Sequence, residues 1–197
     1  MFAGHFGLAA AVKAMEPQVP LWALMASTQL MDIVFIPLLL SGVESLEPIG
    51  DGGYGKTIIH ADYTHSLVGA LLISAIACFI AWRIWNMRSA IVIGSLTFSH
   101  WLIDLVVHRS DMPFFPGNWG DLPLLGFRLW QFPVISAAAE IVLVLIGAIL
   151  YFRSVIARAK KTEKTEKKSK AIKQAYGIGS LMAFFLVLSF VTDYLGL

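Results

Sequence analysis

Long apolar runs, separated by short polar segments, make up most of this chain. The apolar runs cover residues 2–15, 21–41, 66–82, 89–108, 132–152 and 175–195. All but the first reach the roughly 17–25 residues that an α-helix needs to cross a bilayer. The first would form a helix only about 21 Å long, short enough for a thin span, a re-entrant helix or an interfacial helix. The pattern predicts an all-α fold, a polytopic transmembrane helical bundle with five to six membrane segments.

Composition supports a membrane protein. Of the 197 residues, 57% are hydrophobic and 14% are charged, whereas soluble domains average about 45–50% and about 25%. The chain contains no internal repeat and no second domain, so residues 1–197 are expected to form a single integral membrane domain. Its single cysteine, Cys78, excludes an internal disulfide and a cysteine-based metal site.

The distribution of charge predicts the orientation of the segments. Residues 153–173 hold most of the lysines, and Arg83 and Arg88 flank another turn. Basic loops remain on the cytoplasmic side, so the acidic loop 42–65 and the aromatic loop 109–131 are expected outside. We interpret 153–173 as a solvated cytoplasmic loop and expect no nucleic-acid partner.

Three polar residues interrupt the apolar run 89–108. His100, Asp104 and His108 follow one another at four-residue intervals and therefore share one stripe of a helix. Ionisable groups at bilayer depth cost about 3 kcal/mol or more, so they usually face a partner or a cavity. The stripe could serve as hydrogen-bonding contacts between helices, but three such residues together favour a functional site.

Other ionisable residues fall at comparable depths. His60 and His65 flank the start of the third apolar run, where Thr64 or Ser66 could cap a helix. Asp32 lies in the middle of the second run, where a buried carboxylate needs a cation, a metal or a hydrogen-bond donor.

Imidazoles and carboxylates without thiolates are a ligand set for a divalent metal. Zinc fits best, with manganese or iron as alternatives. The candidate metal ligands are His5, Asp32, His60, His65, His100, Asp104 and His108. In this arrangement a carboxylate beside a ligand histidine could instead orient the imidazole ring.

Three further charged residues have more than one interpretation. Glu140, at mid-segment, could be a ligand, a base, a proton relay or an interhelical contact. Asp193 is expected to be solvated near the outer end of the last run. Arg109 could pair with Asp111, hold an anionic group or extend to the membrane interface.

Residues 1–116 resemble a known family. His5 in "GHFGLA", the "H-x-x-x-T-H-S-L" motif from His60 to Leu67 and "SHWLID" at Ser99 to Asp104 are similar to the bacterial inner-membrane metal-dependent hydrolases, the group named for a LexA-binding member. The resemblance implies a small multi-pass helical protein of the bacterial inner membrane. It also implies a metal site built from these histidines and aspartates in the half 1–116, with helices 132–195 matching only in spanning the membrane.

The leading hypothesis from the sequence is a metal-dependent hydrolase whose site lies near the extracytoplasmic face. A bound metal would activate water, and Asp104 or Asp32 would accept the proton. Closeness to lipid favours a lipid or amphiphilic ester or phosphoester as substrate. Two alternatives are a metal or proton transporter, with Asp32, Glu140 and Asp104 along its path, and a non-catalytic subunit of a membrane complex that ligates a pigment or haem. A homo-oligomer is compatible with each.

Overall fold

In the computed structural model, which describes residues 1–50, 53–162 and 165–195, the chain is mainly α-helical. The helices are α1 (Phe2–Met15), α2 (Leu21–Thr28), α3 (Leu30–Leu40), α4 (Leu67–Ile84), α5 (Met87–Val107), α6 (Pro133–Lys160) and α7 (Thr165–Leu195). Two short strands, β1 (Ser45–Pro48) and β2 (Thr57–His60), pair antiparallel, and single-turn 3-10 helices lie at Pro116–Asn118 and Leu129–Gln131. The predicted all-α fold is confirmed, with one small sheet added to it.

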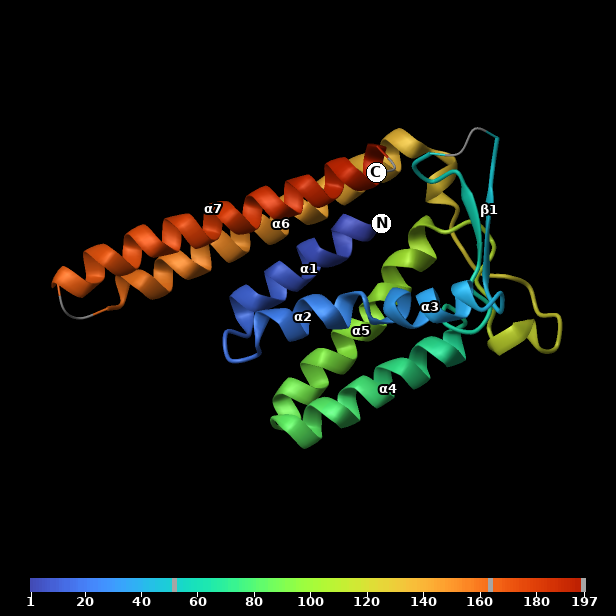
Figure 1. The fold of residues 1–197 in the computed structure, drawn as a ribbon, viewed down its shortest axis with the longest axis horizontal. Coiled ribbons are helices and arrows are strands. Elements are labelled where there is room, and N and C mark those ends of the chain that lie inside the picture. The colour runs from blue at the N-terminus through green and yellow to red at the C-terminus, as the bar shows by residue number, and fades with distance from the viewer. Residues whose placement is uncertain (51–52, 163–164, 196–197) are drawn as a thin grey trace.

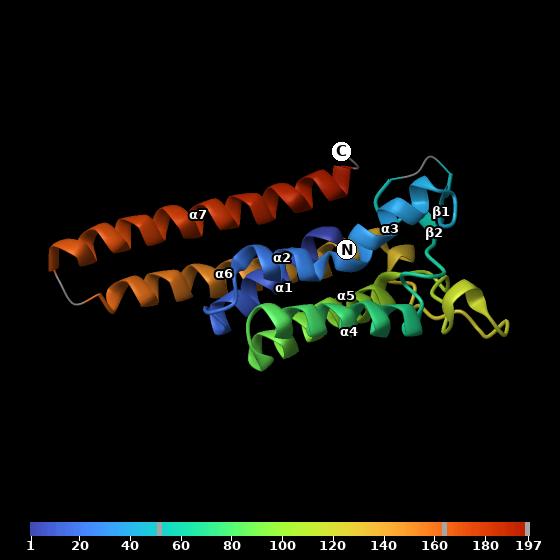
Figure 2. The same cartoon turned by 60° about the horizontal axis from the view of Figure 1, so that its bottom comes forward.

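The helices are arranged in layers that share one long direction. The α6–α7 hairpin lies on one side and the α4–α5 pair on the other, with α1, α2 and α3 between them (Figures 1 and 2). The β1–β2 hairpin and the loop between α5 and α6 gather at one end. The end of α6 and the start of α7, which carry most of the basic residues, lie at the opposite end (Figure 1).

Within the described residues, four helices are long and apolar enough to cross a membrane: α4, α5, α6 and α7. A fifth span exists if α2 and α3, which meet at a bend of 52°, are counted together. Helix α1 has only 14 residues and is shorter than a typical span. The membrane segments therefore number four or five by length, and α1 is a short helix held inside the bundle.

Small residues bring α1 unusually close to α6. A Cβ atom on Gly147 of α6 would lie 2.0 Å from the carbonyl oxygen of Gly7, and one on Gly7 would lie 2.6 Å from the oxygen of Leu143. Such close crossings through glycine and alanine are typical of helix pairs in membranes. Through this contact α1 lies deep in the bundle, and His5 is almost completely buried.

The expected single segment 21–41 is broken at Gln29, which corrects the prediction of one continuous helix. Just before the break, the hydroxyls of Ser27 and Thr28 donate to the carbonyl oxygens of Leu24 and Met25. Such back-bonding side chains often bend a helix. The break places Asp32 in the first turn of α3 rather than in the middle of a helix.

Two predicted loops are also more regular than expected. The segment 42–65 contains the β1–β2 hairpin, whose register pairs Ser45 with His60. The basic segment 153–173, expected as a loop, continues α6 to Lys160 and begins α7 at Thr165. Lysine, arginine, glutamate and alanine favour helix, so both helices extend beyond the apolar runs.

The close crossing of α1 and α6 predicts the effect of one methyl group. Gly147→Ala should lower the free energy of unfolding by about 1–3 kcal/mol, because its Cβ has no room beside Gly7. Thermal unfolding of the purified protein in detergent measures this. Gly177→Ala is the matched control, since a Cβ there has nothing within 4 Å. Equal unfolding temperatures for Gly147→Ala and the control would contradict the assigned crossing.

Candidate metal centre

Side chains from α1, α3 and α5, and one from the segment just before α4, converge near the hairpin end of the bundle. The two Nε2 atoms of His65 and His100 lie 3.3 Å apart. Asp32 Oδ1 is 3.5 Å from each of them. Asp104 Oδ2 lies 2.9 Å from His100 Nε2 and 3.6 Å from His65 Nε2. The imidazoles and Asp104 are almost completely buried, while the Asp32 side chain is 35% exposed.

These separations suit ligands of one small ion. Four ligands about 2.0–2.2 Å from a tetrahedral metal lie about 3.3–3.6 Å from one another. Of the five distances above, four fall in this interval and one is shorter. Two mutually close groups of metal-binding residues are present among the described residues: Asp32, His65 and His100, and His5, His100 and Asp104.

Outer hydrogen bonds determine which ring nitrogens face the centre. His100 Nδ1 lies 2.6 Å from the carbonyl oxygen of Thr28, which can only accept, so Nδ1 carries the proton. Nε2 therefore faces Asp32 and Asp104, as a lone pair in the neutral ring and as an N–H donor in the protonated ring. The carbonyl belongs to the last residue of α2, just before the break that also positions Asp32.

A chain of two hydrogen bonds, which we call the Glu44–Thr64–His65 relay, orients His65. Thr64 Oγ1 is 3.1 Å from both carboxylate oxygens of Glu44 and 2.9 Å from His65 Nδ1. Glu44 is buried and also accepts the backbone N–H groups of Tyr63 and Thr64. The threonine hydroxyl must donate to Glu44, and therefore it accepts from His65 Nδ1–H. His65 Nε2 therefore faces His100 Nε2.

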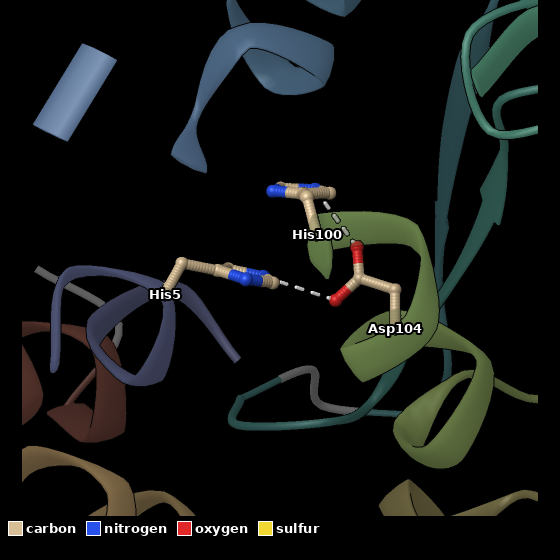
Figure 3. A group of neighbouring side chains, drawn as sticks. All are labelled: His5, His100 and Asp104. Atoms are coloured by element: carbon tan, nitrogen blue, oxygen red, sulfur yellow. Dashed lines mark hydrogen bonds and ion pairs between the residues drawn. The ribbon is translucent and has the colours of Figure 1, made fainter. Parts of the chain in front are cut away.

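His5 and His108 flank the centre. The His5 ring stacks on that of His100, with centroids 3.9 Å apart, and His5 Nε2 lies 3.1 Å from Asp104 Oδ1 (Figure 3). His108 Nε2 is 3.9 Å from Asp104 Oδ2, while its Nδ1 lies 3.0 Å from Asp111. Asp104 therefore has histidines at both of its oxygens.

Of the seven predicted ligands, the structure brings together six: His5, Asp32, His65, His100, Asp104 and, at a longer distance, His108. His60 is exposed on β2, with Nε2 3.5 Å from Glu47. The hairpin turns this side chain away because residues on a strand alternate between faces. Ser66 caps α4 by accepting from the Gly69 N–H, as the sequence suggested.

Several contributing residues were not recognised in the sequence. Glu44 was taken as a loop acid, and the carbonyl of Thr28 has no sequence signal. Asp111, one of the possible partners of Arg109, contacts His108 and accepts from the Ile59 N–H, while Arg109 donates to the carbonyl of Gly55. The adjacency of Thr64 to His65 was the one available clue.

A polar cavity of about 190 Å³ touches the centre. Of the clustered side chains, all but His100 line it, together with Phe2, Trp130 and Asp193. A second cavity of about 350 Å³ under the hairpin shares Trp130 and Asp193 with the first. We call the two together the polar chamber. It gives the centre room for water and for a small chemical group.

Two carboxylates accept hydrogen bonds from the N-terminal end of α1, beside the polar chamber. The fully buried Glu140 accepts from the Gly4 N–H at 3.0 Å, and Asp193 accepts from the Phe2 N–H at 3.2 Å. Helix N-termini attract negative charge, and α1 lacks a side-chain cap of its own. Glu140 is therefore an interhelical contact, and Asp193 is partly buried rather than freely solvated.

Tyr54 in the hairpin loop completes this contact. Its hydroxyl donates to Glu140 Oε2 at 2.6 Å. Burial raises the pKa of Tyr54, and the hydrogen bond to Glu140 raises it further. The phenol therefore stays protonated at neutral pH and links the hairpin to α6.

The role of Glu140 predicts a difference between two substitutions. Glu140→Ala should cost about 1–3 kcal/mol of stability, because it leaves a buried N–H and the Tyr54 hydroxyl without an acceptor. Glu140→Gln keeps an amide oxygen that can accept and should retain more of the stability. Thermal unfolding of the two variants checks this, and an unchanged unfolding temperature in Glu140→Ala would contradict the role.

The fold and the cluster define a polytopic α-helical membrane protein with a buried histidine–aspartate centre near one end. A family model described as YdjM inner membrane protein matches residues 2–193. The chain therefore belongs to the YdjM inner membrane protein family. Searches of curated proteins and of solved structures returned no match. The family supports an inner-membrane location, and the match does not confirm hydrolysis or LexA binding.

Proposed function

We propose that Asp32, His65, His100 and Asp104 form a divalent-metal centre. The observation that carries the proposal is the direction of the imidazoles: outer acceptors hold Nδ1–H of both rings, so the two Nε2 atoms face each other and two carboxylates. A proton on one Nε2 could satisfy one of these contacts. A metal ion satisfies all of them at once. Outer partners of this kind commonly accompany metal-bound histidine.

Zinc fits this centre best, because the ligands are imidazole and carboxylate at tetrahedral separations. Manganese and iron accept the same ligand types, usually with more ligands. His5 and His108 hold the outer positions, where they restrain Asp104 or enlarge the ligand set.

The carboxylates and the metal centre suit the hydrolysis of an ester or phosphoester of a membrane amphiphile. When bound, the ion would supply Lewis-acid activation. The chain's own carboxylates differ in their suitability as a base. Asp104 is restrained at both oxygens by His5 and His100, whereas Asp32 meets both imidazoles through Oδ1 and is partly exposed in the polar chamber. Asp32 is therefore the better-placed proton acceptor.

Metal content tests the centre directly. The purified protein should hold about one equivalent of metal, and His65→Ala or His100→Ala should lose it, because each removes a ligand. His60→Ala is the control, since that ring lies outside the cluster. Elemental analysis after exhaustive dialysis measures this. Equal metal in all four proteins would show that any ion binds elsewhere.

The Glu44–Thr64–His65 relay predicts a graded effect. Thr64→Val removes the hydroxyl that orients His65 and should weaken metal affinity about 10–100-fold. Thr97→Val is the matched control, because the Thr97 hydroxyl is buried without a partner among the described residues. Competition with a chromogenic chelator measures both affinities. An unchanged affinity in Thr64→Val would show that the relay does not contribute to metal binding.

Hydrolysis tests the reaction separately from the metal. Ester and phosphodiester probes should be cleaved by the protein in vesicles, and the activity should disappear with a chelator and return with zinc. His100→Ala should be inactive under all these conditions. A metal-loaded protein that cleaves none of the probes would be consistent with the metal centre and would contradict the proposed hydrolase activity.

A further inference from the structure

An apolar cavity of about 490 Å³ runs along α7, outside the polar chamber. Phe6 of α1, Met25 of α2, Tyr151 of α6 and Leu186 of α7 contribute to its walls. Almost all of its lining side chains are apolar, with the exceptions of a tyrosine and Ser189. We call this cavity the α7 slot. At bilayer depth such a space is filled by hydrocarbon, because water has few partners there.

The α7 slot ends one helical turn from the polar chamber. Phe2 lines the polar chamber and Phe6, one turn along α1, lines the slot, and their rings contact each other edge to face at 5.2 Å. On the opposite wall, Asp193 lines the chamber and Ser189, one turn along α7, lines the slot. The hydrogen bond from the Phe2 N–H to Asp193 joins the two walls. The same pair of helices therefore lines both cavities, with the Phe2–Phe6 ring contact running from one lining to the other.

The length of the slot suits one acyl chain. From Ile178 to Ser189 the slot extends about 16 Å along α7. An acyl chain that spans half of the roughly 30 Å hydrocarbon core of a bilayer covers about 15 Å. The slot begins one helical turn from Asp193 of the polar chamber and continues past the middle of the apolar run 175–195.

We propose that the α7 slot holds an acyl chain of the substrate, a glycerophospholipid-like amphiphile whose polar part enters the polar chamber. This inference rests on the proposed function and names the substrate class of its site. The polar chamber alone is too small for a whole lipid, and the slot alone has no reactive group. Phe2 is 45% exposed, so a chain can enter sideways from the same leaflet past the ring pair.

Photolabelling locates the chain. A lysophosphatidylcholine with a diazirine in its acyl chain is added to the full-length protein in phosphatidylcholine vesicles and activated by light. The label is expected in peptides that contain Met25 and Leu186, which face the slot from α2 and α7. Label spread evenly over the lipid-exposed faces of all helices, α4 included, would overturn the proposal.

Slot-filling variants provide the second arm. Met182→Trp and Leu181→Trp enlarge side chains of the slot wall and should reduce slot labelling about tenfold or more. Leu181 is 56% exposed, so its replacement does not depend on repacking the core. Leu188→Trp is the matched control, because Leu188 is an exposed residue of α7 outside the slot. Equal labelling in the three variants and the wild type would also overturn the proposal.

The metal content of each labelled sample separates the two hypotheses. Slot-specific label in a protein without metal would support the acyl site and reject the metal centre beside it. A metal-loaded protein with no slot-specific label would reject the acyl site and leave the metal centre intact.

Discussion

The crowding of acceptor atoms at one point of an apolar bundle is the constraint on which the rest of the structure depends. Two imidazole Nε2 atoms and two carboxylates lie within 3.6 Å of their neighbours around His100. Carboxylate charges are costly away from water, so a proton on an imidazole or a bound cation must balance them. The break at Gln29 serves this centre twice, since it presents the Thr28 carbonyl to His100 and brings Asp32 to the start of α3. The hairpin contributes Glu44, which acts on His65 through Thr64.

Helix α1 connects the centre to the C-terminal helices. Its glycines allow a backbone approach to α6 that larger residues would prevent, and His5 thereby reaches Asp104 (Figure 3). Glu140 and Asp193 then satisfy the N-terminal N–H groups of α1. The half 132–195, which the family resemblance did not cover, therefore supports the centre through α1 and forms one wall of the polar chamber.

The sequence predicted which residues form the centre better than it predicted how these residues are arranged. The four-residue spacing placed His100 and Asp104 on one stripe of α5, because helical periodicity is local. Likewise, length and hydropathy predicted most of the membrane segments. The hydrogen bonds of Glu44 to Thr64 and the position of His60 outside the centre could not be predicted. Both depend on how the hairpin folds against α5. The break at Gln29 depends on side-chain back-bonding that apolar periodicity does not reveal, and the extension of α6 and α7 follows helix propensity beyond the apolar runs.

X-ray absorption at the metal edge of the purified protein tests the central claim most directly. The account predicts a first shell of nitrogen and oxygen at about 2.0–2.2 Å, with the outer-shell scattering that imidazole rings produce. Substituting His65 or His100 should remove that imidazole signal. A sulfur neighbour at about 2.3 Å, which would implicate Cys78, would contradict it, and so would a spectrum without imidazole scattering.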